Sequence, residues 1–83
     1  MFWKLMQLSK ARSAARSHDW STAATYYEKI YRSDNNDVKA LIQLAHALKE
    51  QGDIDAAKNK YAEAANKFER HSDAQRQAGL FFL

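Results

Sequence analysis

Three histidines are the residues best suited to metal binding or proton transfer, and their spacing favours neither. His18, His46 and His71 lie 28 and 25 residues apart along the chain, whereas a helical zinc site typically places two histidines four positions apart. His18 falls in a predicted turn and is expected to be an ordinary solvated residue. The histidines therefore predict no metal site and no catalytic base.

Other catalytic patterns are also missing from the sequence. The chain has no cysteine, so it has no thiolate nucleophile, no thiolate zinc ligand and no disulfide. Its two glycines form no phosphate-binding loop, and no carboxylate pair stands isolated in an apolar stretch. The acids lie instead in turns, at helix starts and in pairs such as Glu63 and Lys67, one helical turn apart. The sequence predicts a non-catalytic chain without catalytic residues, metal or cofactor.

The positive charge of the chain is concentrated in its first eighteen residues. These carry Lys4, Lys10, Arg12 and Arg16 and no acid, while the rest is nearly balanced and the net charge is +3. A domain-wide basic surface for nucleic acid is therefore not expected. No apolar run approaches the roughly 20 residues that span a bilayer, and "MFWKLMQL" lacks the pattern of a signal peptide. The absence of cysteine fits a reducing compartment, and a cytoplasmic location is the expectation.

The elements that must position any functional side chain are helices. The 83 residues make one small domain, and at 46% hydrophobic residues it is too apolar to be disordered. Apolar residues recur at three-to-four spacing in five segments: 3–16, 20–32, 38–50, 54–68 and 72–83.

Polar residues and a glycine mark the limits of these segments. Ser17 or Asp19 is predicted to cap the second helix, Asn36 or Asp37 the third, and Ser72 the fifth. Gly52 is predicted to end the third helix in a left-handed conformation.

The same periodicity predicts which side chains are buried. Each segment carries one apolar stripe at helical spacing. The predicted members are Leu5, Leu8, Ala11, Ala14 and Ala15; Trp20, Ala23, Ala24, Tyr27 and Ile30; Leu41, Leu44, Ala45 and Leu48; and Ile54, Ala57, Tyr61, Ala64 and Phe68.

An internal repeat of 34 residues relates the two halves of the chain. Asp19, Ala23 and Tyr27 align with Asp53, Ala57 and Tyr61, and Trp20 aligns with Ile54. Residues 38–71 match a known pattern of large and small residues at nine positions in order: Leu41, Leu44, Ala45, Leu48, Gly52, Ile54, Ala57, Tyr61 and Ala64. In this pattern the stretch resembles the tetratricopeptide repeat, in which small residues sit where two helices cross closely.

The flanking stretches resemble the repeat less closely. Residues 4–37 match in their second half at Asp19, Trp20, Ala23, Tyr27 and Ile30, but have His18 for glycine and Gln7 and Lys10 at apolar positions. Terminal repeats are often atypical because one of their faces is exposed to solvent, so this first repeat is interpreted as degenerate. Residues 72–83, with Ala78, Gly79 and Phe82 in register and Gln75 out of pattern, are interpreted as a capping helix or the first helix of a third repeat.

The resemblance implies an all-α array of helical hairpins, about five antiparallel helices in a right-handed superhelix, spanning residues 1–83 as one domain. It also implies a protein–protein interaction or scaffold module whose first helices line a concave face. The residues implied at that face are Leu8, Arg12, Arg16, Lys39, Ile42, His46, Lys49 and Arg76, with Leu5, Ala15, Glu50 and Asp73 at further positions of the same kind. The mixture of basic and apolar side chains suggests a protein or peptide partner with acidic character. The alternative interpretation is that these residues are simply the solvated faces of helices. The lysine and asparagine of the family's carboxylate-clamp subtype are absent: Leu8 and Arg12, or Ile42 and His46, stand there.

Apolar residues at both ends form a second predicted surface. Its members are Phe2, Trp3, Met6, Leu80, Phe81, Phe82 and Leu83. An exposed apolar patch marks an interface or missing chain, and three explanations stay open. In the first, the chain is part of a longer protein whose next helix covers Phe82. In the second, it forms a homo-oligomer, and in the third its basic aromatic first helix holds an attached enzyme at an anionic membrane surface.

Overall fold

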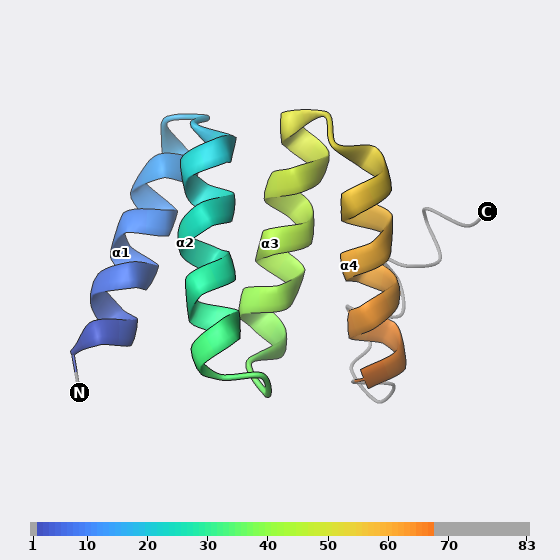
Figure 1. Ribbon diagram of the computed structural model, residues 1–83. Coiled ribbons are helices and arrows are strands. Elements are labelled where there is room, and N and C mark those ends of the chain that lie inside the picture. The colour runs from blue at the N-terminus through green and yellow to red at the C-terminus, as the bar shows by residue number, and fades with distance from the viewer. Residues whose placement is uncertain (1, 68–83) are drawn as a thin grey trace.

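The computed structural model describes residues 2–67 and shows four helices of equal length joined by short turns (Figure 1). They are α1 (Trp3–Arg16), α2 (Trp20–Ser33), α3 (Val38–Gln51) and α4 (Ile54–Lys67), each of 14 residues. Their bounds agree with the predicted segments to within one residue. The all-α helical-hairpin fold is therefore confirmed, while the predicted fifth helix at 72–83 lies outside the described residues.

Aspartate side chains fix the starts of the helices that follow turns. Asp19 accepts a hydrogen bond from the Thr22 N–H at 3.3 Å, and Asp37 accepts one from the Ala40 N–H at 3.0 Å. These bonds satisfy N–H groups that have no partner within the first helical turn. Of the alternatives in the sequence, Asp19 and Asp37 rather than Ser17 and Asn36 are the caps.

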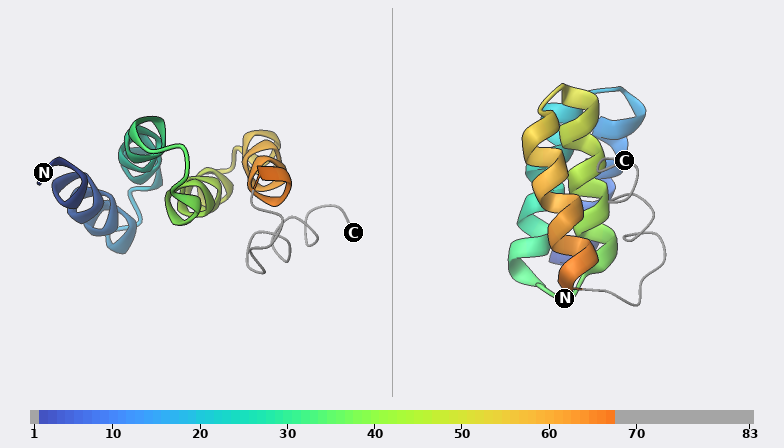
Figure 2. Two further views of the ribbon diagram at one scale, coloured as in Figure 1. Left: turned by 90° about the horizontal axis from the view of Figure 1, so that it is seen from below. Right: turned by 90° about the vertical axis from the view of Figure 1, so that its right-hand side faces the viewer.

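The four helices form a row in which direction alternates and neighbours in sequence are neighbours in space. Seen along the helix axes, α1 and α3 lie on one side of the row and α2 and α4 on the other (Figure 2). Close packing joins α1 to α2, α2 to α3, and α3 to α4. This arrangement leaves α1 at one end of the described row, with α2 as its main partner.

The core runs between the two sides of the row and consists of small and large apolar residues in alternation. Ala11, Ala23, Ala45 and Ala57 are all fully buried, as expected where two helix backbones approach closely. Leu41, Ile30 and Tyr61 are the largest fully buried side chains and fill the space between these crossings.

Several predicted burials prove wrong or only partly right. Leu5 and Ile54 are exposed, and Trp20 is only half-buried. Gln7, which departs from the apolar pattern, is instead buried. In α1 the buried side is centred on Ala11, and Leu5 lies well away from it around the helix. Phe68 lies outside the described residues.

A polar contact joins the two helices on the other side of the row. The Tyr31 hydroxyl of α2 donates a 2.7 Å hydrogen bond to Glu63 of α4, and the Lys67 ammonium donates to the same hydroxyl at 3.3 Å. Burial, followed by this bond to a carboxylate and the nearby negative charge, raises the pKa of Tyr31 to about 12.

No helix within residues 2–67 combines the length and apolar character needed to cross a bilayer.

Candidate functional site

A groove of about 490 Å³ opens between α1 and α3. Its lining comes from three helices and the turn before α3, which meet because α1 and α3 lie on the same side of the row (Figure 2). The lining residues are Lys4, Leu8, Arg12, Tyr27, Ile30, Asp37, Lys39, Ala40, Ile42 and Gln43.

The floor of the groove is apolar and belongs to the core. Tyr27 and Ile30 of α2 and Ala40 of α3 are buried beneath it. Burial raises the pKa of Tyr27, although the positive charge of Arg12 acts in the opposite direction. The tyrosine is therefore a neutral phenol at physiological pH, with Arg12 close enough to affect its titration.

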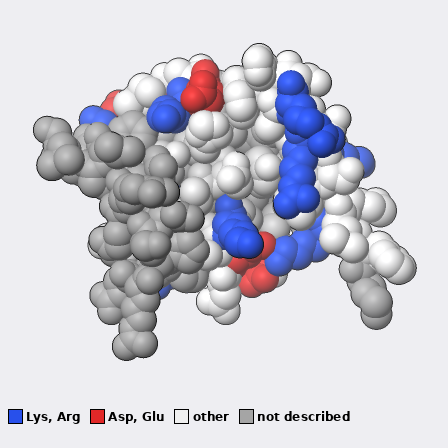
Figure 3. All heavy atoms as spheres, turned by 180° about the vertical axis from the view of Figure 1, so that it is seen from behind, with Lys and Arg blue, Asp and Glu red and all other residues white. Residues whose placement is uncertain are grey.

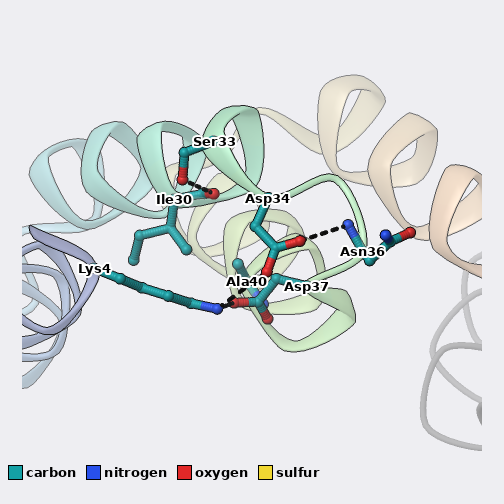
Figure 4. A network of polar contacts seen from close by, with 7 residues as sticks. All are labelled: Lys4, Ile30, Ser33, Asp34, Asn36, Asp37 and Ala40. Atoms are coloured by element: carbon teal, nitrogen blue, oxygen red, sulfur yellow. Dashed lines mark hydrogen bonds and ion pairs between the residues drawn. The ribbon is translucent and has the colours of Figure 1, made fainter. Parts of the chain in front are cut away.

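An ion-pair network lies at one end of the groove, where Lys4 and Asp37 are part of the lining (Figure 4). The Lys4 ammonium lies 2.7 Å from an Asp37 carboxylate oxygen and 3.3 Å from one of Asp34. Hydrogen bonds to both carboxylates raise the pKa of Lys4. Partial burial would raise the pKa of Asp37, but the hydrogen bonds from Lys4 and from the Ala40 N–H outweigh it and the pKa falls below its usual value. The network connects α1 to the turn between α2 and α3. The charge of Lys4 is paired within it.

Each wall of the groove carries a cation that is not paired with a carboxylate of the described residues. Arg12 on α1 and Lys39 on α3 are exposed, and within the described part of the chain neither joins an ion pair. Figure 3 views this side of the row and shows lysine and arginine side chains gathered over it, with few acidic ones. Leu8 and Ile42, both half-buried, lie in the same walls. The groove thus combines an apolar base with available positive charge at its rim.

Comparison with known protein families identifies this architecture. A tetratricopeptide repeat model matches residues 14–78, which cover most of the chain. The chain belongs to the tetratricopeptide repeat family. Tetratricopeptide repeats generally mediate protein–protein interaction or scaffolding and are typically non-catalytic. Neither the search of curated proteins nor that of solved structures finds a match.

The structure brings together four of the eight residues that the repeat positions implied. Leu8, Arg12, Lys39 and Ile42 all line the groove. Arg16, His46 and Lys49 do not line it, and Arg76 lies outside the described residues.

His46 instead belongs to a cluster of rings beside the groove. The Trp20 ring meets His46 edge-on at 5.4 Å between centroids and stacks on His18 at 5.8 Å. His18 is exposed, as predicted for a turn residue, but its ring has a neighbour. Within residues 2–67 no three metal-ligating side chains lie close enough to hold an ion.

Six of the ten lining residues were not anticipated from the sequence as part of a binding site: Lys4, Tyr27, Ile30, Asp37, Ala40 and Gln43. Tyr27 matched the repeat as a packing residue, and its contribution to the floor depends on how far α1 and α3 stand apart. Lys4 and Asp37 are 33 positions apart, and no spacing rule connects them. The only sequence signal for Lys4 was that it is the first cation of an acid-free segment.

The predicted apolar surface at the chain ends is visible at one end only. Phe2, Trp3 and Met6 are exposed, and Leu5 joins them. Leu80, Phe81, Phe82 and Leu83 lie outside the described residues.

Proposed function

We propose that this domain is a non-catalytic interaction module whose groove binds a short acidic segment of a partner protein. One observation carries the proposal: Arg12 and Lys39 stand on opposite walls of an apolar groove and have no ion-pair partner among residues 2–67. Apolar side chains of the segment would contact Leu8 and Ile42, and its carboxylates would pair with the two cations.

The size and polarity of the groove limit the ligand. A volume of about 490 Å³ falls in the usual range for binding clefts and suits a few residues in extended conformation. The carboxylates of Asp34 and Asp37 at the Lys4 end disfavour further negative charge there. The acidic part of the segment is therefore placed toward Arg12, away from the ion-pair network.

The test measures binding of a labelled peptide by fluorescence polarisation. The probe is an octapeptide of alternating Glu and Leu, and an octapeptide of alternating Lys and Leu serves as the charge-reversed control. The Arg12→Gln/Lys39→Gln variant should lose about tenfold in affinity for the acidic peptide, since two partly exposed charge pairs contribute about 0.7 kcal/mol each.

A matched variant separates local recognition from net charge. Lys29→Gln/Lys58→Gln also removes two positive charges, one from α2 and one from α4, and does not touch the groove lining. It should change the affinity by less than twofold at 150 mM salt, where charges beyond about 8 Å are screened. Equal losses in the two variants, or equal binding of the two peptides, would rule out the groove as the acidic binding site.

A further inference from the structure

The outward side of α1 carries an exposed apolar cluster that the groove does not use. Phe2, Trp3, Leu5 and Met6 are 70%, 44%, 63% and 52% exposed, and we call these four residues the α1 tip. Among the described residues, Ile54 is the only other large apolar side chain that is exposed. Four such residues within five positions make a localised patch, which a monomeric surface usually avoids. We propose that the α1 tip and the cations beside it bind an anionic phospholipid surface.

The charge around the α1 tip favours an anionic partner. Residues 1–18 contain no acid, and Lys10, Arg12 and Arg16 follow the tip along the same helix and are all exposed. Lys4, the remaining cation of α1, is turned toward Asp34 and Asp37 and does not contribute. Each lysine or arginine close to an anionic bilayer contributes on the order of 1 kcal/mol.

The distribution of apolar residues along α1 favours a bilayer over a partner helix. A docked helix is recognised through apolar residues at positions i, i+3, i+4 and i+7. The exposed face that begins with Phe2 and Met6 continues instead as Ser9, Ser13 and Arg16. Apolar side chains confined to one end can enter the interface while serines and cations further along reach the head groups.

The position of α1 in the fold makes this contact accessible. It is the end helix of the described row and packs mainly on α2, so its outward side is open (Figures 1 and 2). None of the four residues of the α1 tip lines the groove between α1 and α3, so this apolar cluster is separate from it, and Arg12 is the only cation that the two surfaces share among those named here. The inference does not depend on the proposed peptide binding.

Vesicle co-flotation of the full 83-residue chain tests the proposal. Vesicles of phosphatidylcholine with 30 mol% phosphatidylserine should retain the protein at 50 mM salt, and release it at 500 mM salt, since screening weakens the charge contacts. Pure phosphatidylcholine vesicles should bind it at least tenfold more weakly. Lys10→Gln/Arg16→Gln should reduce partitioning on anionic vesicles by about thirtyfold, the effect of two cations near the surface. Leu5→Asn/Met6→Asn should reduce it at least fivefold.

Two controls make the result specific to α1. Lys39→Gln/Lys58→Gln removes the same charge from α3 and α4, and Ile54→Asn removes the exposed apolar side chain of α4. Both should partition within twofold of the parent chain. In addition, vesicles should shift the tryptophan emission to the blue, and Trp3→Phe should abolish most of the shift while the protein still floats.

Three results would overturn the proposal. The first is no binding to anionic vesicles at 50 mM salt. The second is an equal loss of binding in Lys10→Gln/Arg16→Gln and in its control. The third is a dimer in light scattering that Leu5→Asn/Met6→Asn converts to monomer, because the α1 tip would then be covered by a second copy.

Discussion

The turn between α1 and α2 and the turn between α3 and α4 are built from the same contacts, 34 residues apart. The Asp19 N–H donates to the Ala14 carbonyl at 2.8 Å, and the Asp53 N–H donates to the Leu48 carbonyl at 2.9 Å. Each aspartate then caps the next helix through its side chain, at 3.3 and 3.4 Å. The backbone of the repeat is therefore preserved in the hairpin whose side chains fit the family pattern poorly.

The interiors of the two hairpins differ much more than their turns. Leu41 and Leu44 of α3 are 0% and 2% exposed, and the equivalent positions of α1 hold Gln7 and Lys10. Gln7 is buried, yet its side-chain oxygen has no hydrogen-bond partner within the described residues. The Lys10 ammonium lies 5.6 Å from the centroid of the Tyr26 ring. This side chain therefore contacts an aromatic ring, whereas the equivalent Leu44 is buried in the core.

The number of neighbours explains this difference. α3 packs against both α2 and α4, whereas α1 packs mainly against α2. Leu44 is therefore enclosed while the equivalent Lys10 is exposed, and Gln7 is buried without the full set of neighbours that surrounds Leu41. The small residues Ala11 and Ala45 are fully buried in both, because both hairpins need a close helix crossing. At these two positions, large apolar residues thus occur in the helix that has two neighbours.

The largest effect on stability is expected from shortening a buried side chain of α3, the better-packed of the two helices. Leu41→Ala should lower the free energy of unfolding by about 3 kcal/mol, through lost burial and the cavity left behind. At the equivalent position, Gln7→Leu should raise it by about 1 kcal/mol, because it removes a buried oxygen without a partner. Urea unfolding followed by circular dichroism at 222 nm measures both. A Gln7→Leu variant less stable than the parent would show that the glutamine is needed for packing.

The sequence predicts the helices well because their signals are local. Three-to-four spacing, the aspartate caps and Gly52 are each defined by a few adjacent residues, and the helix bounds follow from them. Exposure at Leu5 and burial at Gln7 depend on where α2 lies. Three of the ten groove residues, Tyr27, Lys4 and Asp37, reach the groove only because of how the helices pack. Those features arise from tertiary packing, which a repeat pattern specifies only at its own positions.

An intermediate effect is expected where the two hairpins are joined. Tyr31→Phe removes the hydrogen bond to Glu63 and should cost about 1.5 kcal/mol at pH 8, as expected for a bond to a charged group. The pKa of Tyr31 is about 12 in the folded chain, against an ordinary value of about 10. Because the folded pKa is raised, this stabilisation is complete below pH 10 and is lost as the pH rises toward 12.

The pH dependence can be measured as a difference between parent and variant. Urea unfolding at pH 8 and at pH 11.5 should show the gap between the parent and Tyr31→Phe shrinking at the higher pH. Tyr26→Phe is the matched control, because no hydrogen bond of the Tyr26 hydroxyl occurs among residues 2–67. A constant gap across this range would mean that the hydroxyl stabilises the hairpin contact by packing alone.

The smallest effects on stability are expected from substitutions in the two turns, whose backbone conformations are alike but whose residues differ. Gly52 has φ +98° with no atom within 4 Å of an added Cβ, and His18 has φ +60°. Gly52→Ala should therefore cost about 1 kcal/mol through backbone strain alone. His18→Gly relieves a similar backbone strain, which stabilises the fold. It also removes the ring stack on Trp20 and raises the conformational entropy of the unfolded chain, and both of these effects destabilise the fold. Its net effect should lie within about 0.5 kcal/mol of zero by the same urea measurement. A loss above 1 kcal/mol in His18→Gly would show that ring stacking fixes the first turn, where glycine conformation fixes the second.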